Sequence, residues 1–199
     1  MQTRVPLLAL LLAGCASAAA APDANAQLAR DIYEELVQIN TSQSTGDTYK
    51  AAQAMAARLL AAGLPAADVR TFETAPKRGN LVARLRGTGK RKPLLLLAHL
   101  DVVEAKREDW TTDPFKFVEK DGYFYGRGTS DDKAMAAAWV ANLVRYKKEG
   151  YRPDRDLILV LETDEEHSDD SGLGITWLLK NQRPLIDAEF ALNEGGGVA

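Results

Sequence analysis

The fold is decided by residues 93–101, PLLLLAHLD, an apolar run that ends in two polar side chains, His99 and Asp101. Four consecutive leucines leave no polar face for water, so the pattern predicts a strand that is buried on both of its faces. Strands of this kind belong to α/β folds. In those folds the chemistry lies just beyond the carboxyl ends of the strands.

The segments around this strand alternate between helical and extended patterns. Apolar residues recur at spacings of three and four in residues 25–39, and Asp47 is suited to cap a second helix that runs to Leu60. This alternation predicts an α/β fold with a mostly parallel sheet flanked by helices. Further helices are expected at 131–149 and 174–181, strands at 69–72, 80–85, 94–98, 156–161 and 189–192, and a hairpin around Asp121-Gly122 within 115–125.

The composition is that of a soluble globular protein. The chain has 199 residues, of which 46% are hydrophobic and 27% charged, and its net charge is −3. No basic stripe interleaved with aromatic residues is present in the sequence. We therefore expect no nucleic-acid partner.

Residues 1–26 have the pattern of an export signal: Arg4 near the start, an apolar core at 5–12, then small residues. The core is too short for a bilayer, which needs about 20 apolar residues. The sequence LAGC at 12–15 resembles the lipobox of bacterial lipoprotein precursors, in which the cysteine is lipidated, and Cys15 is the only cysteine in the chain.

The pattern thus predicts an exported protein, periplasmic or anchored to the outer membrane through a lipid on Cys15. Simple cleavage after an Ala-x-Ala sequence, at 16–18 or 24–26, is the alternative, and it would allow full secretion. Either route leaves residues 27–199 as the folded part, and a single cysteine excludes an intramolecular disulfide.

Polar residues gather where the predicted strands end. The carboxyl ends of parallel strands meet at one edge of a sheet, so these side chains are expected to converge. Several carboxylates beside one imidazole repel one another unless a cation neutralises them, and imidazole favours zinc over calcium or magnesium. The residues are His99, Asp101, Asp164, Glu165, Glu166 and Glu194 after strands, with Asp131 and Asp132 at the start of the helix at 131–149.

Four motifs occur in a recognisable order: AHLDVV at 98–103, GRGTSDDK at 126–133, TDEE at 163–166 and NEGGG at 193–197. Together they resemble the co-catalytic zinc metallopeptidase family, which contains glutamate carboxypeptidases, aminoacylases, carnosinase-like dipeptidases and acetylornithine deacetylases. The resemblance implies an α/β catalytic domain with an inserted lid or dimerisation domain. It also implies two Zn²⁺ ions per active site, for which Co²⁺ or Mn²⁺ could substitute.

The resemblance assigns a metal-binding role to four residues of this chain. His99 and Glu194 would bind one zinc, Glu166 would help to bind the other, and Asp131 would bridge the two. A further histidine, which family members supply after the lid domain, would complete the second site. No such residue follows Glu194 in this sequence.

Two more residues receive catalytic roles from the same resemblance. Glu165 would be the general base, and the carboxylate of Asp101 would accept the ring proton of His99 and so fix the direction of the imidazole. By contrast, we expect Asp132 and Lys133 to serve the start of the helix. His167 is expected to be a surface residue.

Family members are substantially longer than this chain. We therefore interpret residues 27–199 as the N-terminal part of the catalytic domain, truncated before the lid domain, and expect the fragment alone to be inactive and poorly soluble. A homodimer would need that lid domain.

Three functions remain open from the sequence. The preferred one is an exported zinc exopeptidase of the carboxypeptidase or dipeptidase type, acting on peptides. The second is an N-acyl-amino-acid deacylase with the same metals and base. The third is a non-catalytic, metal-binding remnant. The motifs do not indicate which side chain or which acyl group of the substrate is preferred.

Overall fold

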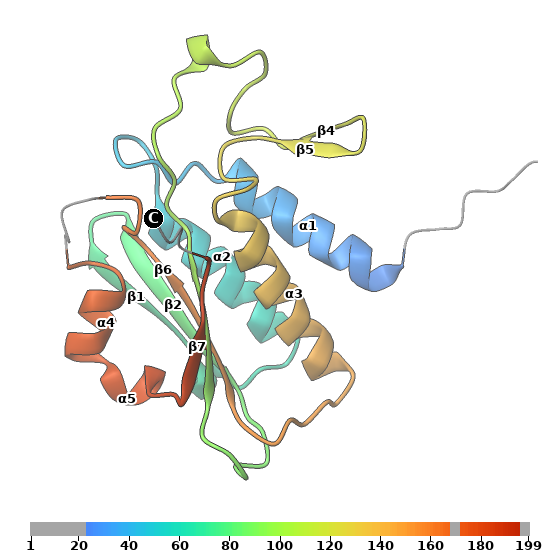
Figure 1. The fold of residues 1–199 in the computed structure, drawn as a ribbon, viewed down its shortest axis with the longest axis vertical. Helices are drawn as coiled ribbons and strands as arrows, with labels where there is room; N and C mark the ends of the chain where they lie inside the picture. The colour runs from blue at the N-terminus through green and yellow to red at the C-terminus, as the bar shows by residue number, and fades with distance from the viewer. Residues whose placement is uncertain (1–22, 168–171, 196–199) are drawn as a thin grey trace, which may run out of the picture.

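The leucine-rich strand β3 (Leu94–His99) lies between β6 (Leu157–Glu162) and β7 (Phe190–Leu192) in a five-stranded sheet of order β1-β2-β6-β3-β7 (Figure 1). The two remaining strands are β1 (Val69–Ala75) and β2 (Arg78–Leu85). This computed structural model describes residues 23–167 and 172–195. It confirms the predicted α/β fold, a sheet flanked by helices.

The sheet is mixed, which corrects the expectation of a mostly parallel one. β3 pairs in parallel with β6 and β7, whereas β2 pairs antiparallel with both β1 and β6. Only Pro76 and Lys77 separate β1 from β2. A parallel pair needs a crossover of a dozen residues or more, so two residues permit only a hairpin.

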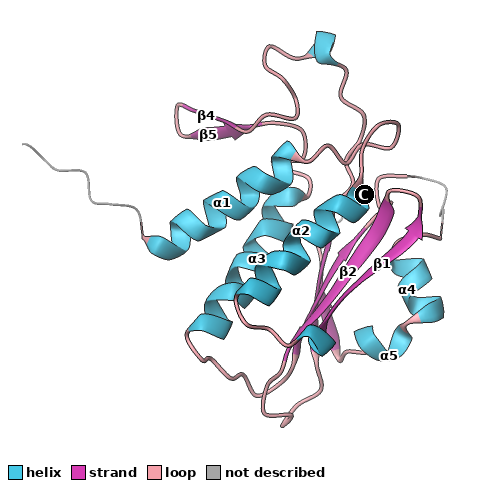
Figure 2. Cartoon of the chain, turned by 180° about the vertical axis from the view of Figure 1, so that it is seen from behind, coloured by secondary structure: helices cyan, strands magenta, loops and turns pink. Residues whose placement is uncertain are grey.

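Helices cover both faces of the sheet, as both views show (Figures 1 and 2). One face carries the larger hydrophobic core, under α1 (Ala24–Gln38), α2 (Thr48–Ala61) and α3 (Lys133–Lys148). The other face carries a smaller core under α4 (Ile175–Asn181) and α5 (Arg183–Ile186). Every residue of β6 is buried as a result. Because helices cover both faces of the sheet, the sequences of β3 and β6 are nearly continuous apolar runs.

Most predicted elements are present. The Asp47 carboxylate accepts a hydrogen bond from the backbone N–H of Lys50 and caps α2, as expected. The hairpin consists of β4 (Val118–Lys120) and β5 (Tyr123–Tyr125), and its first strand begins later than the aromatic alternation suggested. Three short helices were not predicted: α5 and the 3₁₀ turns at Ala66–Asp68 and Arg107–Asp109.

The predicted signal segment lies almost wholly outside the described residues. Residues 1–22, including Cys15, are not described, whereas Ala24, Asn25 and Ala26 form the first turn of α1 behind the cap residue Asp23. No helix within 23–167 and 172–195 is long and apolar enough to cross a membrane.

Candidate metal centre

The centre of the site is His99, the last residue of β3, whose side chain is only 2% exposed. Its Nδ1 lies 2.9 Å from the backbone oxygen of Asp101. A carbonyl oxygen can only accept a hydrogen bond, so Nδ1 carries the proton in this contact. The ring is thereby oriented with Nε2 towards a group of carboxylates.

Three carboxylates surround Nε2 of His99. Asp131 Oδ1 lies 2.8 Å away, Glu194 Oε1 3.7 Å and Glu165 Oε2 3.9 Å. These residues come from the start of α3, from beyond β7 and from beyond β6. The strand ends therefore bring together the residues that the sequence pattern grouped.

Within the described residues, two sets of three side chains each have ligand atoms within 4.8 Å of one another. One set is His99, Asp131 and Glu166, and the other is His99, Asp132 and Glu194. Both sets share the imidazole of His99. The four predicted metal ligands are therefore neighbours in space, and Asp132 joins them.

Asp101 is fully inside the site, but its contacts differ from the expected ones. Its side chain is 3% exposed, and the carboxylate oxygen nearest to Nδ1 of His99 is 3.7 Å away, beyond hydrogen-bond distance. The carboxylate instead accepts the backbone N–H groups of Glu165, at 3.2 Å, and Glu166, at 3.0 Å. The backbone carbonyl of Asp101 thus orients His99, while its side chain holds the loop after β6.

Burial, with the charges of neighbouring carboxylates, raises the pKa of three acids in the site. Burial, together with the charge of Glu194, raises the pKa of Asp132 to about 6. Burial raises the pKa of Glu166 and of Glu194, and the neighbouring carboxylate of Asp131 adds to both shifts. Burial and, to a lesser extent, repulsion between the carboxylates both disfavour the charged forms here, and a bound cation would favour them.

The imidazole of His99 responds in the opposite sense. Burial lowers its pKa, but the charge of Asp101 and the hydrogen bond to Asp131 outweigh burial and raise the pKa to about 8. Near neutral pH a proton therefore lies between Nε2 and Asp131. A metal cation at Nε2 would take the place of that proton. Imidazole with carboxylate oxygens is a donor set that zinc accepts, so the residues fit the predicted metal.

Asp132 was expected to converge with the other polar residues, but its surroundings differ from the helix-start role predicted for it. It was assigned to capping the helix, yet its side chain makes no capping hydrogen bond to α3. Its Oδ2 accepts the backbone N–H of His99 at 3.4 Å, and it is 4% exposed. The signal was the Asp131-Asp132 pair itself, since a helix start needs only one capping carboxylate.

Lys133 is completely buried, and its Nζ donates to the backbone oxygen of Ile39 at 2.8 Å. This contact ties the start of α3 to the end of α1, which agrees with the structural role expected for it. Gly128 makes room for the lysine: a Cβ there would lie 2.8 Å from Lys133 Cδ, and its φ of +86° favours glycine.

His167 is not the surface residue that we expected. Its side chain is 17% exposed, and Nδ1 lies 3.5 Å from Asp101 Oδ2 and 3.6 Å from Asp164 Oδ1. The tight turn after β6 that brings Glu165 and Glu166 to Asp101 also folds the next residue inward.

Fold and site together define an α/β domain that gathers side chains able to hold a metal ion at the carboxyl ends of its strands. The chain belongs to the peptidase family M20/M25/M40, whose sequence profile matches residues 95–199. The resemblance inferred from the four motifs is thereby confirmed.

Two curated relatives illustrate the range of the family. The chain is 40% identical over 107 residues to human N-fatty-acyl-amino acid synthase/hydrolase PM20D1, covering 53% of this chain and 20% of the relative. It is 31% identical over 168 residues to aminoacylase-1 of Sus scrofa, covering 82% of this chain and 40% of the relative. The chain thus spans a fifth to two fifths of the length of these relatives.

Solved structures agree on the fold. The M20 family metallo-carboxypeptidase Sso-CP2 of Sulfolobus solfataricus superposes with a TM-score of 0.68 at 20% identity, over 85% of this chain and 38% of that one. Human carnosine dipeptidase 1 gives a TM-score of 0.66 at 18% identity, over 87% and 41%. At such identities the likeness concerns the fold alone.

Proposed function

We propose that this protein is a zinc-dependent hydrolase of amide bonds. The observation that carries the proposal is the environment of His99 Nε2, which faces carboxylates of Asp131, Glu194 and Glu165 within 3.9 Å. Carboxylates this close together repel one another electrostatically unless a cation lies between them. Membership in a family of peptidases supports hydrolysis of an amide bond as the reaction at this cluster.

Four side chains would hold the metal: His99, Asp131, Glu166 and Glu194, with Asp132 close enough to contribute. When bound, zinc supplies a Lewis acid that polarises the amide carbonyl and makes water acidic enough to attack near neutral pH. A pair of ions, with Asp131 between them, is the arrangement proposed from the motifs. Co²⁺ or Mn²⁺ could substitute.

Glu165 is the proposed general base. Its carboxylate is 43% exposed and lies 3.9 Å from His99 Nε2, so it borders the metal position while remaining open to substrate. Its backbone N–H is held by the Asp101 carboxylate, which fixes where the side chain begins. Glu165 would accept the proton of the attacking water and then deliver it to the departing amine.

The substrate is proposed to be either a peptide or an N-acyl amino acid. Exopeptidase action, of the carboxypeptidase or dipeptidase type, is the first candidate. The second is favoured by the names of the relatives described above, an N-fatty-acyl-amino acid synthase/hydrolase and an aminoacylase. Both reactions break an amide bond next to an amino acid, so one metal site and one base serve either.

The deciding experiment combines zinc binding with hydrolysis by the protein at its full natural length. Zinc content is measured by mass spectrometry, and release of free amino acid is followed from a dipeptide and from a medium-chain N-acyl amino acid. We expect zinc-dependent release from at least one of them, and loss of bound zinc in His99→Ala. Zinc binding without hydrolysis of either substrate would favour the non-catalytic remnant, and absence of zinc binding would refute the proposal.

We also propose that residues 1–26 direct export and that Cys15 carries a lipid anchor in the mature protein. Support comes from the charged start, apolar core and LAGC sequence. Fractionation of cells tests the proposal: the protein should sediment with membranes, and Cys15→Ser should release it. A wild-type protein that is found only in the soluble periplasmic fraction would favour simple cleavage.

A further inference from the structure

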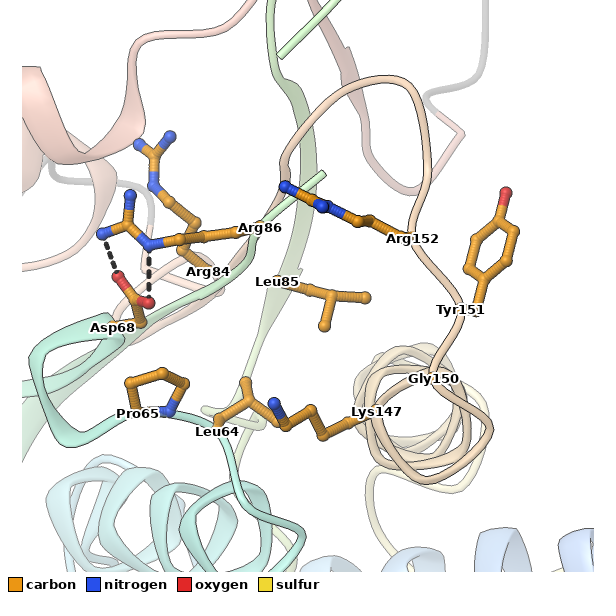
Figure 3. Close-up of a pocket in the computed structure, with 10 residues that line it drawn as sticks. All are labelled: Leu64, Pro65, Asp68, Arg84, Leu85, Arg86, Lys147, Gly150, Tyr151 and Arg152. Atoms are coloured by element: carbon orange, nitrogen blue, oxygen red, sulfur yellow. Dashed lines mark hydrogen bonds and ion pairs between the residues drawn. The ribbon is translucent and has the colours of Figure 1, made fainter. Parts of the chain in front are cut away.

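We propose that a pocket at the opposite edge of the sheet binds a small phosphate monoester that carries an apolar group. The pocket has a volume of about 300 Å³ and lies between the end of α2, the end of β2 and the loop that follows α3 (Figure 3). That volume is at the lower end of the range for ligand sites, about 300–1,000 Å³.

The pocket is separate from the metal centre. Leu85, at its base, pairs with Leu157 at the start of β6, whereas His99 pairs with Glu162 at the end of β6. The full length of β6 therefore lies between the two sites. A smaller hollow of about 100 Å³ adjoins the pocket and shares Asp68, Arg84 and Arg86 with it.

Two of the four cations that line the pocket are already neutralised. Arg86 donates two hydrogen bonds to the Asp68 carboxylate, at 2.8 and 2.5 Å, and Arg84 is 2.8 Å from Asp156. These two ion pairs form part of the pocket wall. Arg86 remains accessible to solvent, since its side chain is 67% exposed.

The other two cations, Lys147 and Arg152, have no acidic partner among the residues that the structure describes. Arg152 makes only a long hydrogen bond, 3.4 Å from its Nε to the oxygen of Gly87. Figure 3 shows Arg152 extending over Leu85 towards Arg86, and Lys147 extending towards Leu64. Two uncompensated positive charges therefore face one space in a chain whose net charge is −3.

The floor of the pocket is apolar. Leu64 and Leu85 are 4% and 6% exposed, and Pro65 lies beside them. A ligand that matches both features has a compact group with about two negative charges and an apolar part that rests on the leucines. A phosphate monoester carries about −1.5 to −2 charges at pH 7, and guanidinium forks bind phosphate oxygens in pairs.

Phenyl phosphate is the probe, titrated calorimetrically into the full 199-residue chain with a chelator present to exclude binding to zinc. The double variant Lys147→Gln/Arg152→Gln should weaken binding at least tenfold. The matched control Lys116→Gln/Lys120→Gln removes two charges from the distant hairpin region and should change binding less than twofold. Circular dichroism checks the fold. Arg152→Glu, at an exposed loop position, provides a second test that should also weaken binding tenfold.

Inorganic phosphate and benzoate separate the two parts of the proposed ligand. Each lacks one part, so each should bind at least fivefold more weakly than phenyl phosphate. Equal binding of either, unchanged binding in both pocket variants, or no measurable binding in the wild type would overturn the proposal. Vesicles that contain phosphatidic acid distinguish the source: sedimentation that is lost in the double variant would assign a lipid headgroup, and its absence a soluble ester.

Discussion

Buried acids at the two ends of the β6 strand, which define two opposite edges of the sheet, have different partners. At the edge opposite the metal centre, Asp68 is 5% exposed and is held by two hydrogen bonds from the guanidinium of Arg86. At the carboxyl ends of β3 and β6, Asp101 is 3% exposed and its carboxylate accepts hydrogen bonds from two backbone N–H groups. One edge pairs its buried acid with an arginine, whereas the other gathers three carboxylates around the single imidazole of His99.

The largest expected effect is on catalysis. Glu165→Ala should keep zinc bound but reduce turnover by about 10²–10⁴-fold, because the base that takes the proton from water is lost. The measurement is the rate of amino-acid release by the full-length protein together with its zinc content. Glu149→Ala, at the other edge, removes an exposed carboxylate that pairs with Arg145 and should leave turnover unchanged. Turnover retained in Glu165→Ala would remove Glu165 from the role of base.

The next effect is on pH-dependent stability. Burial, with the nearby charge of Asp101, raises the pKa of Glu162 to about 7 from the 4.5 of an unfolded chain. The folded state therefore binds this proton more tightly, and stability falls as the pH rises from 4.5 through 7.

Glu162→Gln removes the ionisable group and with it the fall in stability between pH 4.5 and 7. At pH 8 the metal-free variant should be more stable than the wild type by up to about 3 kcal/mol, and at pH 4 the two should agree. Urea unfolding at both pH values with a chelator present measures the difference. The exposed Glu73→Gln is the matched control. A difference that is the same at both pH values would show that ionisation of Glu162 is not its cause.

A smaller effect concerns metal affinity. Asp101→Asn leaves only one acceptor oxygen for the two backbone N–H groups of Glu165 and Glu166, so zinc affinity should fall about 10–100-fold. Asp68→Asn makes the same chemical change at the other edge. It should lower stability, because it breaks the pair with Arg86, and leave zinc affinity unchanged. Competition with a chromophoric chelator gives both affinities, and equal losses in the two variants would contradict the contrast between the edges.

The smallest effect is local. Asp47→Ala removes the cap of α2 and should cost about 1 kcal/mol of unfolding free energy in urea. α2 begins near the metal edge, and Leu64, which lines the pocket, follows its C-terminal end. A cap acts only on its own helix turn. Neither zinc nor phenyl phosphate binding should change. Asp187→Ala, an exposed carboxylate after α5, should leave stability unaltered.

Much of the fold could be predicted from local patterns. Three such patterns are the leucine run of β3, the spacing of apolar residues in α1 and the Asp47 cap. Each depends on residues that are close in the chain, so it can be recognised in the sequence. The antiparallel pairing of β2 with β6 was missed, because it depends on which distant strands meet. The burial of His167 was missed for a similar reason: its surroundings come from β3 and from the turn after β6.

The class of fold, the family and the set of polar residues that end the strands could be read from the sequence, because strand burial, helix periodicity and motif order are properties of the chain. The neighbours of each acid, by contrast, are set by the three-dimensional packing. Asp131, Asp132 and Glu194 all carry a carboxylate. The packing of α3 against β3 and the pairing of β7 with β3 bring these carboxylates to one imidazole. Asp68 meets Arg86 instead. Electrostatic energy depends on distance in space and on exclusion of water, and both are set when the sheet assembles.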